Sequence, residues 1–233
     1  MTGPVQLDRV WKYFGDFPAL RDISFTVPTG ACLALLGRNG AGKTTLLRIL
    51  AGLSSPAQGN VALLGHEPRN AEARARIGFI GHGIAVYDEL SAEENLRHFA
   101  RLYGLANPNH SASQWLERVW LDRVRHSLVR EFSRGMRQRL ALARAFLHSP
   151  SLLLLDEPFT SLDDRAIALL QSLLKDRLGL GATVIMSTHQ LREAMELSDH
   201  VALLVRGKLA HFGPRPEEMI GDPTWLYRTY GEE

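Results

Sequence analysis

The chain has 233 residues, 45% of them hydrophobic and 22% charged, which suits one large globular domain or one domain with a subdomain. A formal net charge of +2 gives no electrostatic case for a nucleic-acid partner, so we expect none. The single cysteine, Cys32, excludes an internal disulfide and a cysteine-based metal cluster, and no apolar run approaches the length of a membrane-spanning helix.

The first third of the chain predicts mostly strands. Residues 5–10 and 20–27 are expected to form an N-terminal antiparallel β-part, with aromatic residues 11–14 beside the turn between them. Later strands are predicted at residues 31–36, 60–65 and 77–80. The strand at 31–36 is short and wholly apolar, which is typical of a strand buried on both faces.

The middle of the chain predicts helices. Ser91 is a candidate N-cap with Glu94 at the capping-box position, and the helix should continue to Gly104. Residues 107–109 contain a proline and are expected to break the chain. Further helices are predicted at residues 113–121 and 133–147.

The last third alternates between strands and helices. Apolar strands are predicted at residues 151–155 and 182–187, with helices at 163–178 and 191–197. Arg206-Gly207 separates two further strands and signals a hairpin. The tail from Pro214 is expected to hold one short helix. We therefore predict an α/β fold with a mostly parallel sheet.

One glycine-rich stretch fits the pattern G-x-x-x-x-G-K-[ST] between a predicted strand and a predicted helix. Such a loop turns backbone N–H groups towards phosphate oxygens, and the helix N-terminus adds partial positive charge. Lys43 would pair with the β- and γ-phosphates, and the Thr44 hydroxyl would bind Mg²⁺. The predicted nucleotide-binding residues here are Gly37, Arg38, Asn39, Gly40, Ala41, Gly42, Lys43, Thr44 and Thr45.

Two acidic residues follow the apolar strand at 151–155. A carboxylate at the end of a buried parallel strand points into the crevice where ligands bind. Asp156 is therefore a candidate Mg²⁺ ligand, and Glu157 a candidate to orient or deprotonate an attacking water. His189 follows the strand at 182–187 and is a second catalytic candidate.

The start of the helix at 133–147 has an unusual composition. Ser133 is a plausible N-cap, and Gly135 is a poor helix former that would let a phosphate approach backbone N–H groups. Both residues belong to one of the motifs that together resemble a known family.

Taken together, these motifs resemble those of ATP-binding cassette (ABC) proteins. Residues 37–44 look like the Walker A loop, 132–136 like the signature motif, 152–157 like Walker B with its catalytic glutamate, 161–163 like the D-loop and His189 like the switch histidine. Phe14 matches the aromatic that stacks on adenine, with Tyr13 as the alternative. A P-loop kinase would not explain Ser133, residues 161–163 and His189 in this order.

The sequence departs from the family pattern at two places. The family signature is usually Leu-Ser-Gly-Gly-Gln, whereas Arg134 and Met136 replace the first glycine and the glutamine here. His82 stands where the family usually has a glutamine that senses Mg²⁺, and its charge would vary near neutral pH. Its assignment to the metal site is therefore the doubtful one.

The resemblance implies an ATPase that uses ATP and Mg²⁺ and works as a head-to-tail homodimer with a separate integral membrane subunit, at the cytoplasmic face of the membrane. It implies one nucleotide-binding domain over residues 1–233, with 1–87 and 150–213 as the core, 88–149 as a helical subdomain and 214–233 as a tail. Residues 80–82, 95–96, 132–136 and 156–159 resemble the heme-exporter ATPase of cytochrome c maturation. They also resemble drug and polysaccharide exporters, and a soluble non-transport ABC ATPase is the remaining alternative.

Overall fold

The structure is a computed structural model that describes residues 3–81 and 85–231. Its elements are, in chain order, β1 (Val5–Phe14), β2 (Phe17–Val27), β3 (Cys32–Leu36), α1 (Lys43–Leu50), β4 (Gln58–Leu63), α2 (Ala71–Arg74), β5 (Ile77–Ile80), α3 (Ala92–Leu102), α4 (Pro108–Arg118), η1 (Asp122–Val124), η2 (Val129–Glu131), α5 (Arg134–Phe146), β6 (Leu152–Asp156), α6 (Asp164–Gly179), β7 (Thr183–Ser187), α7 (Leu191–Met195), β8 (His200–Val205), β9 (Lys208–Pro214), α8 (Glu218–Gly221) and α9 (Trp225–Tyr230). The predicted α/β class is confirmed.

The larger sheet has the strand order β5-β6-β7-β3-β8-β9. All neighbouring pairs are parallel except β8 and β9, which form the antiparallel hairpin predicted from Arg206-Gly207. The five residues of β3 are all buried, as the continuous apolar run predicts. The carboxyl ends of β3, β6 and β7 lie together, so the residues that follow them share one edge of the sheet.

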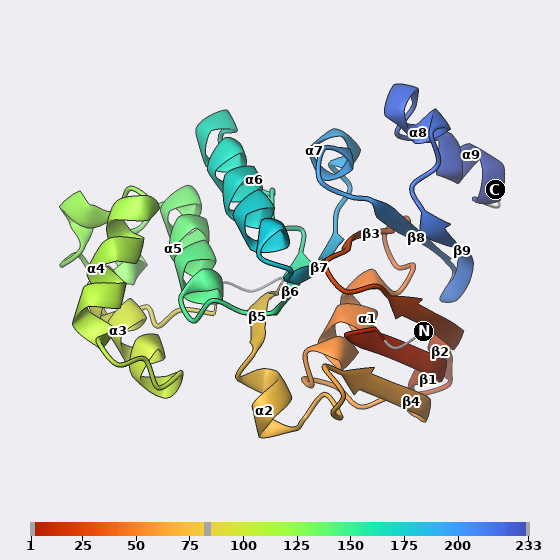
Figure 1. Ribbon diagram of the computed structural model, residues 1–233, viewed down its shortest axis with the longest axis horizontal. Coiled ribbons are helices and arrows are strands. Elements are labelled where there is room, and N and C mark those ends of the chain that lie inside the picture. The colour runs from red at the N-terminus through yellow and green to blue at the C-terminus, as the bar shows by residue number, and fades with distance from the viewer. Residues whose placement is uncertain (1–2, 82–84, 232–233) are drawn as a thin grey trace.

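The two faces of this sheet pack against different elements (Figure 1). Alternate residues of β3 point in opposite directions: Leu33 and Leu35 join a core with α1 and the N-terminal strands, whereas Ala34 and Leu36 join a core with α6, α7 and the tail. A third core is built from side chains between Ala92 and Ala143. It belongs to the helical group at the left of Figure 1.

The predicted N-terminal antiparallel sheet is present with the order β2-β1-β4. Its strands are longer than predicted, because β1 and β2 stay paired as far as Phe14 and Phe17. The aromatic residues Trp11, Tyr13 and Phe14 therefore lie within β1, and only residues 15–16 form the turn.

The helices confirm the predicted caps and correct one boundary. Ser91 and Glu94 form the predicted capping box of α3. Our prediction that residues 107–109 break the chain before a helix at 113 was wrong, because Pro108 occupies the first turn of α4. Proline suits that position, where its missing N–H has no partner to lose. The tail holds two short helices, α8 and α9, where one was predicted.

Candidate nucleotide-binding and catalytic site

The phosphate-loop residues lie between β3 and α1, as the motif requires. Gly37, Gly40 and Gly42 have φ angles of 148°, 81° and 106°, a region that side-chain-bearing residues rarely adopt. A Cβ on Gly42 would also lie 2.8 Å from the carbonyl oxygen of Ala19. The loop conformation therefore depends on these glycines.

Lys43 folds back over the loop that precedes it. Its Nζ donates to the carbonyl oxygens of Gly37, at 2.6 Å, and Arg38, at 3.3 Å. Burial lowers the pKa of Lys43, and the nearby carboxylates of Glu157 and Asp156 oppose that shift. The ammonium is thus held at the loop by exchangeable bonds to carbonyl groups.

A pocket of about 330 Å³ joins the phosphate loop to the N-terminal sheet. Phe14, with 57% of its surface exposed, and Phe17, with 62%, both line it and face each other as cross-strand neighbours. Ala19, residues 39–45 and Glu157 complete the lining. Tyr13 is not among the lining residues and instead stacks on Trp11, with 6.0 Å between ring centroids. The geometry favours Phe14 over Tyr13, and it adds Phe17, which the sequence analysis missed.

Asp156 is the last residue of β6 and is buried. Its Oδ1 accepts a hydrogen bond of 2.5 Å from the hydroxyl of Ser187, its register partner on β7. Its Oδ2 is buried without a hydrogen-bond partner within the described residues. A buried carboxylate oxygen is costly to leave unpaired, so this atom is suited to a cation or to a water bound to one.

Glu157 and His189 lie together. The Glu157 Oε2 is 2.8 Å from Nδ1 of His189 and accepts a second hydrogen bond from the His189 backbone N–H at 3.2 Å. The Glu157 side chain is 17% exposed and that of His189 is 66% exposed. Glu157 has a φ of 52°, and its own N–H donates to the Ser187 carbonyl. The backbone is held in an uncommon conformation that sets the direction of the carboxylate.

Ser133 and Gly135 lie at the start of α5, and neither lines the pockets at the phosphate loop. The Ser133 hydroxyl accepts a hydrogen bond from Met136 N–H, which confirms the predicted N-cap. A Cβ on Gly135 would have only one neighbour within 4 Å, the carbonyl oxygen of Ser161 at 3.5 Å. Within the described chain, Gly135 is therefore not required by close packing. His82 lies outside the described residues.

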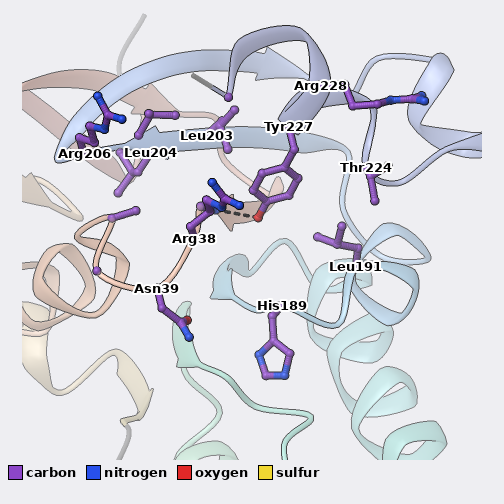
Figure 2. A pocket seen from close by; sticks show the side chains of 15 residues that line it. Arg38, Asn39, His189, Leu191, Leu203, Leu204, Arg206, Thr224, Tyr227 and Arg228 are labelled. Atoms are coloured by element: carbon purple, nitrogen blue, oxygen red, sulfur yellow. Dashed lines mark hydrogen bonds between the residues drawn. The ribbon is translucent and has the colours of Figure 1, made fainter. Parts of the chain in front are cut away.

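A second cavity, of about 940 Å³, lies between the phosphate loop and the tail (Figure 2). Arg38, Asn39 and His189 line one part of it, and Tyr227 projects into it from α9. The Tyr227 hydroxyl accepts a hydrogen bond of 2.9 Å from the Gly37 N–H. The sequence analysis missed this residue, because no local pattern connects positions 190 residues apart.

Comparisons with known proteins show the family of this chain. Residues 20–160 match the family model described as ABC transporter. The Nod factor export ATP-binding protein I of Cupriavidus metallidurans is 38% identical over all of this chain and 78% of its own length. The sulfate/thiosulfate import ATP-binding protein CysA of Synechococcus elongatus is 36% identical over 96% of this chain and 64% of its own.

A solved structure of the ATP-binding subunit of an ABC transporter has a similar fold. It superposes with a TM-score of 0.85 at 29% identity, covering 97% of this chain and 93% of the solved one. In the described part of the present chain, no helix has the length and apolar character needed to cross a membrane. The chain is an ATP-binding subunit of the ABC transporter family, whose ATPases couple ATP hydrolysis to transport.

Proposed function

We propose that this chain binds ATP at residues 37–45 and hydrolyses it with Glu157 as the general base. The observation that carries the proposal is the contact between Glu157 and His189, at the edge of the sheet where the phosphate loop begins. Phe14 also lines the loop pocket, where its exposed ring can stack on adenine. Lys43 would exchange its bonds to carbonyl oxygens for bonds to the β- and γ-phosphates.

The reaction needs a water aligned with the γ-phosphorus. The Glu157 carboxylate accepts a proton as the water oxygen forms a bond to that phosphorus. The bond from the γ-phosphorus to the bridging oxygen breaks, which leaves ADP and inorganic phosphate. His189 holds the Glu157 carboxylate through Nδ1–H and its backbone N–H, so it keeps the base in place.

The residues present fit a Mg²⁺ ion bound together with the nucleotide. Thr44 lies in the lining of the loop pocket, and Asp156 has a buried oxygen without a partner in the described chain. Within residues 3–81 and 85–231, no group of three or more His, Cys, Asp or Glu side chains could hold a metal by itself. We propose that phosphate oxygens and waters complete the site, where Mg²⁺ would neutralise developing phosphate charge.

We propose a head-to-tail homodimer in which Ser133 and Gly135 of one subunit meet the ATP of the other. Two features support this arrangement. Neither residue lines the loop pockets of its own chain, and a Cβ at Gly135 would meet the Ser161 carbonyl oxygen only at ordinary contact distance, 3.5 Å. The Ser133 hydroxyl and the N–H of Gly135 would be the groups that approach the γ-phosphate.

We also propose that the dimer drives export through a separate integral membrane subunit at the cytoplasmic face of the membrane. The core would be residues 1–87 and 150–213, with 214–233 as a tail, and the helical subdomain 88–149 would contact the membrane subunit. The separate core of buried residues between Ala92 and Ala143 supports that division. The Nod factor export relatives favour export as the direction, although the sulfate/thiosulfate import relative is nearly as similar at 36% identity. Heme export in cytochrome c maturation stays a prediction from the sequence, with a drug or polysaccharide as the alternative cargo.

The Glu157→Gln variant tests the assignment of the base. It should bind ATP like the wild type and lose about 10²- to 10⁴-fold in turnover, the usual scale of general-base assistance. Equilibrium titration and steady-state phosphate release would measure the two quantities. Glu67→Gln, at an exposed site, is the matched control and should keep full activity. Turnover by Glu157→Gln within threefold of the wild type would place the base elsewhere.

A further inference from the structure

The tail contacts the phosphate loop through one side chain. Figure 2 shows the Tyr227 ring pointing from α9 towards the start of the loop, with its hydrogen bond to the Gly37 N–H drawn dashed. The donor–acceptor distance is 2.9 Å, which is ordinary for a well-formed N–H···O bond. This bond connects the tail directly to the candidate nucleotide site.

The position of Tyr227 is fixed by its neighbours in α9 and α8. Leu226 and Met219 are fully buried in the core that also contains Leu203 of β8. Asp222 accepts hydrogen bonds from the backbone and hydroxyl of Thr224 and pairs with Arg228. The helix that carries Tyr227 is therefore anchored both by apolar packing and by polar contacts, so its hydroxyl reaches the loop from a defined direction.

Gly37 is held on both sides. Its N–H donates to Tyr227, and its carbonyl oxygen accepts from Lys43 Nζ at 2.6 Å. Its φ of 148° needs glycine, and a Cβ there would lie 2.6 Å from the carbonyl oxygen of Leu204. Because Gly37 is buried, loss of the tyrosine oxygen would leave its N–H without this partner, and an unpaired buried N–H destabilises the loop conformation that contains it.

The state of the tyrosine hydroxyl suits this role. Burial raises the pKa of Tyr227, and the nearby Glu157 acts in the same direction, whereas the Gly37 hydrogen bond opposes them. The phenol therefore stays protonated at neutral pH, and its lone pairs remain available to the Gly37 N–H.

We propose that Tyr227 is a positioning residue, which fixes the first peptide of the phosphate loop and so keeps the loop and Lys43 ready for nucleotide. The inference rests on the proposed binding of ATP at residues 37–45 and gives the tail a part in it. Tyr227 acts through Gly37 and does not itself touch the reacting atoms. A preorganised loop does not have to become ordered when nucleotide binds. Loss of the Tyr227–Gly37 hydrogen bond should therefore weaken nucleotide binding.

The test compares Tyr227→Phe with Tyr230→Phe. Both variants remove one hydroxyl from α9, but Tyr230 packs its ring on His211 and Trp225, away from the loop. ADP binding is measured by titration calorimetry in the presence of Mg²⁺, after circular dichroism has shown that both variants are folded at the temperature of the titration. We expect Tyr227→Phe to raise the ADP dissociation constant at least fivefold and Tyr230→Phe to leave it within twofold.

A second measurement separates positioning from general stability. The KM for ATP should rise in Tyr227→Phe with kcat close to the wild-type value, because the lost bond prepares the loop for binding and takes no part in proton transfer. A lower kcat at unchanged KM would overturn the proposal. So would equal losses of ADP affinity in both tyrosine variants, or a change below fivefold in Tyr227→Phe.

The Lys43→Ala variant distinguishes failure of the Tyr227 proposal from failure of the proposed nucleotide site. If it abolishes ADP binding while Tyr227→Phe binds like the wild type, the loop assignment stands and the role of Tyr227 is rejected. If Lys43→Ala still binds ADP with wild-type affinity, the proposed nucleotide site itself is wrong and the inference falls with it.

Discussion

At the scale of single residues, the phosphate loop owes its shape to Gly37, Gly40 and Gly42, whose φ angles are all positive. Their spacing is local in the sequence. The motif determines which residues lie between β3 and α1, and the structure places them there. The contacts of Glu157 and Tyr227 were not predictable in the same way. A φ of 52° at Glu157 and a hydrogen bond between Gly37 and Tyr227 depend on neighbours far away in the chain.

The Phe14→Ala variant tests the adenine side of the site. Base–aromatic stacking is worth about 1–3 kcal/mol in nucleic-acid-binding proteins, so the ATP dissociation constant should rise about tenfold or more. Fluorescence titration with ATP would measure it. Tyr13→Ala is the control, because Tyr13 does not line the loop pocket. A loss of affinity in Tyr13→Ala alone would show that the wrong aromatic was chosen.

At the scale of elements, the strand β5 is held by Arg144 of α5 and by His148 in the turn that follows this helix. Arg144 donates to the carbonyl oxygen of Phe79 at 2.6 Å, and Nε2 of His148 lies 3.1 Å from the carbonyl oxygen of Ile77. The His148 ring also stacks on Tyr103, with 3.7 Å between centroids. The sequence predicts both elements, but it gives no sign of these contacts, because they join residues about 65–71 positions apart.

His148 should make stability depend on pH. Burial lowers its pKa to about 4, a shift that its hydrogen bond to Ile77 opposes. Its Nδ1 has no hydrogen-bond partner within residues 3–81 and 85–231, so a second N–H would be buried unpaired. The unfolded chain binds this proton near pH 6.5 and the folded chain only near pH 4. Stability from this group is therefore complete above pH 6.5 and is lost as the pH falls towards 4.

Urea unfolding at pH 7 and pH 5 would measure this effect. The wild type should lose about 2 kcal/mol more than His148→Gln between these two pH values. Glutamine can still donate to the Ile77 carbonyl but does not titrate, so the variant controls for other groups. Equal losses in the two proteins would mean that His148 is not kept neutral by the fold.

At the scale of the whole molecule, the alternation of apolar strands and helices predicted the parallel sheet, and periodic helices predicted the middle segment. Short elements escaped prediction: α2 has only four residues and depends on Asn70, whose side chain caps it. The separation of α5 from the phosphate loop was implied by the family resemblance, but no local pattern in the sequence predicts it. Figure 1 shows the two on opposite sides of β5 and β6.

This separation underlies the central claim, that each ATP is shared between the phosphate loop of one subunit and the start of α5 of another. The most direct test mixes Ser133→Arg subunits with Lys43→Ala subunits and measures ATP hydrolysis, preferably with the membrane subunit present. Each variant alone should be inactive, although Ser133→Arg should still bind ATP. A mixed head-to-tail dimer has one site with both lesions and one intact site.

In a random equal mixture, half of the dimers are mixed and each keeps one of two sites, so independent sites should restore about a quarter of the wild-type rate. Cross-linking of differently tagged subunits would confirm that mixed dimers form. Recovery of this size is the result that the account predicts. Wild-type hydrolysis by Ser133→Arg subunits alone would contradict it, because no ATP would then depend on Ser133 of a partner.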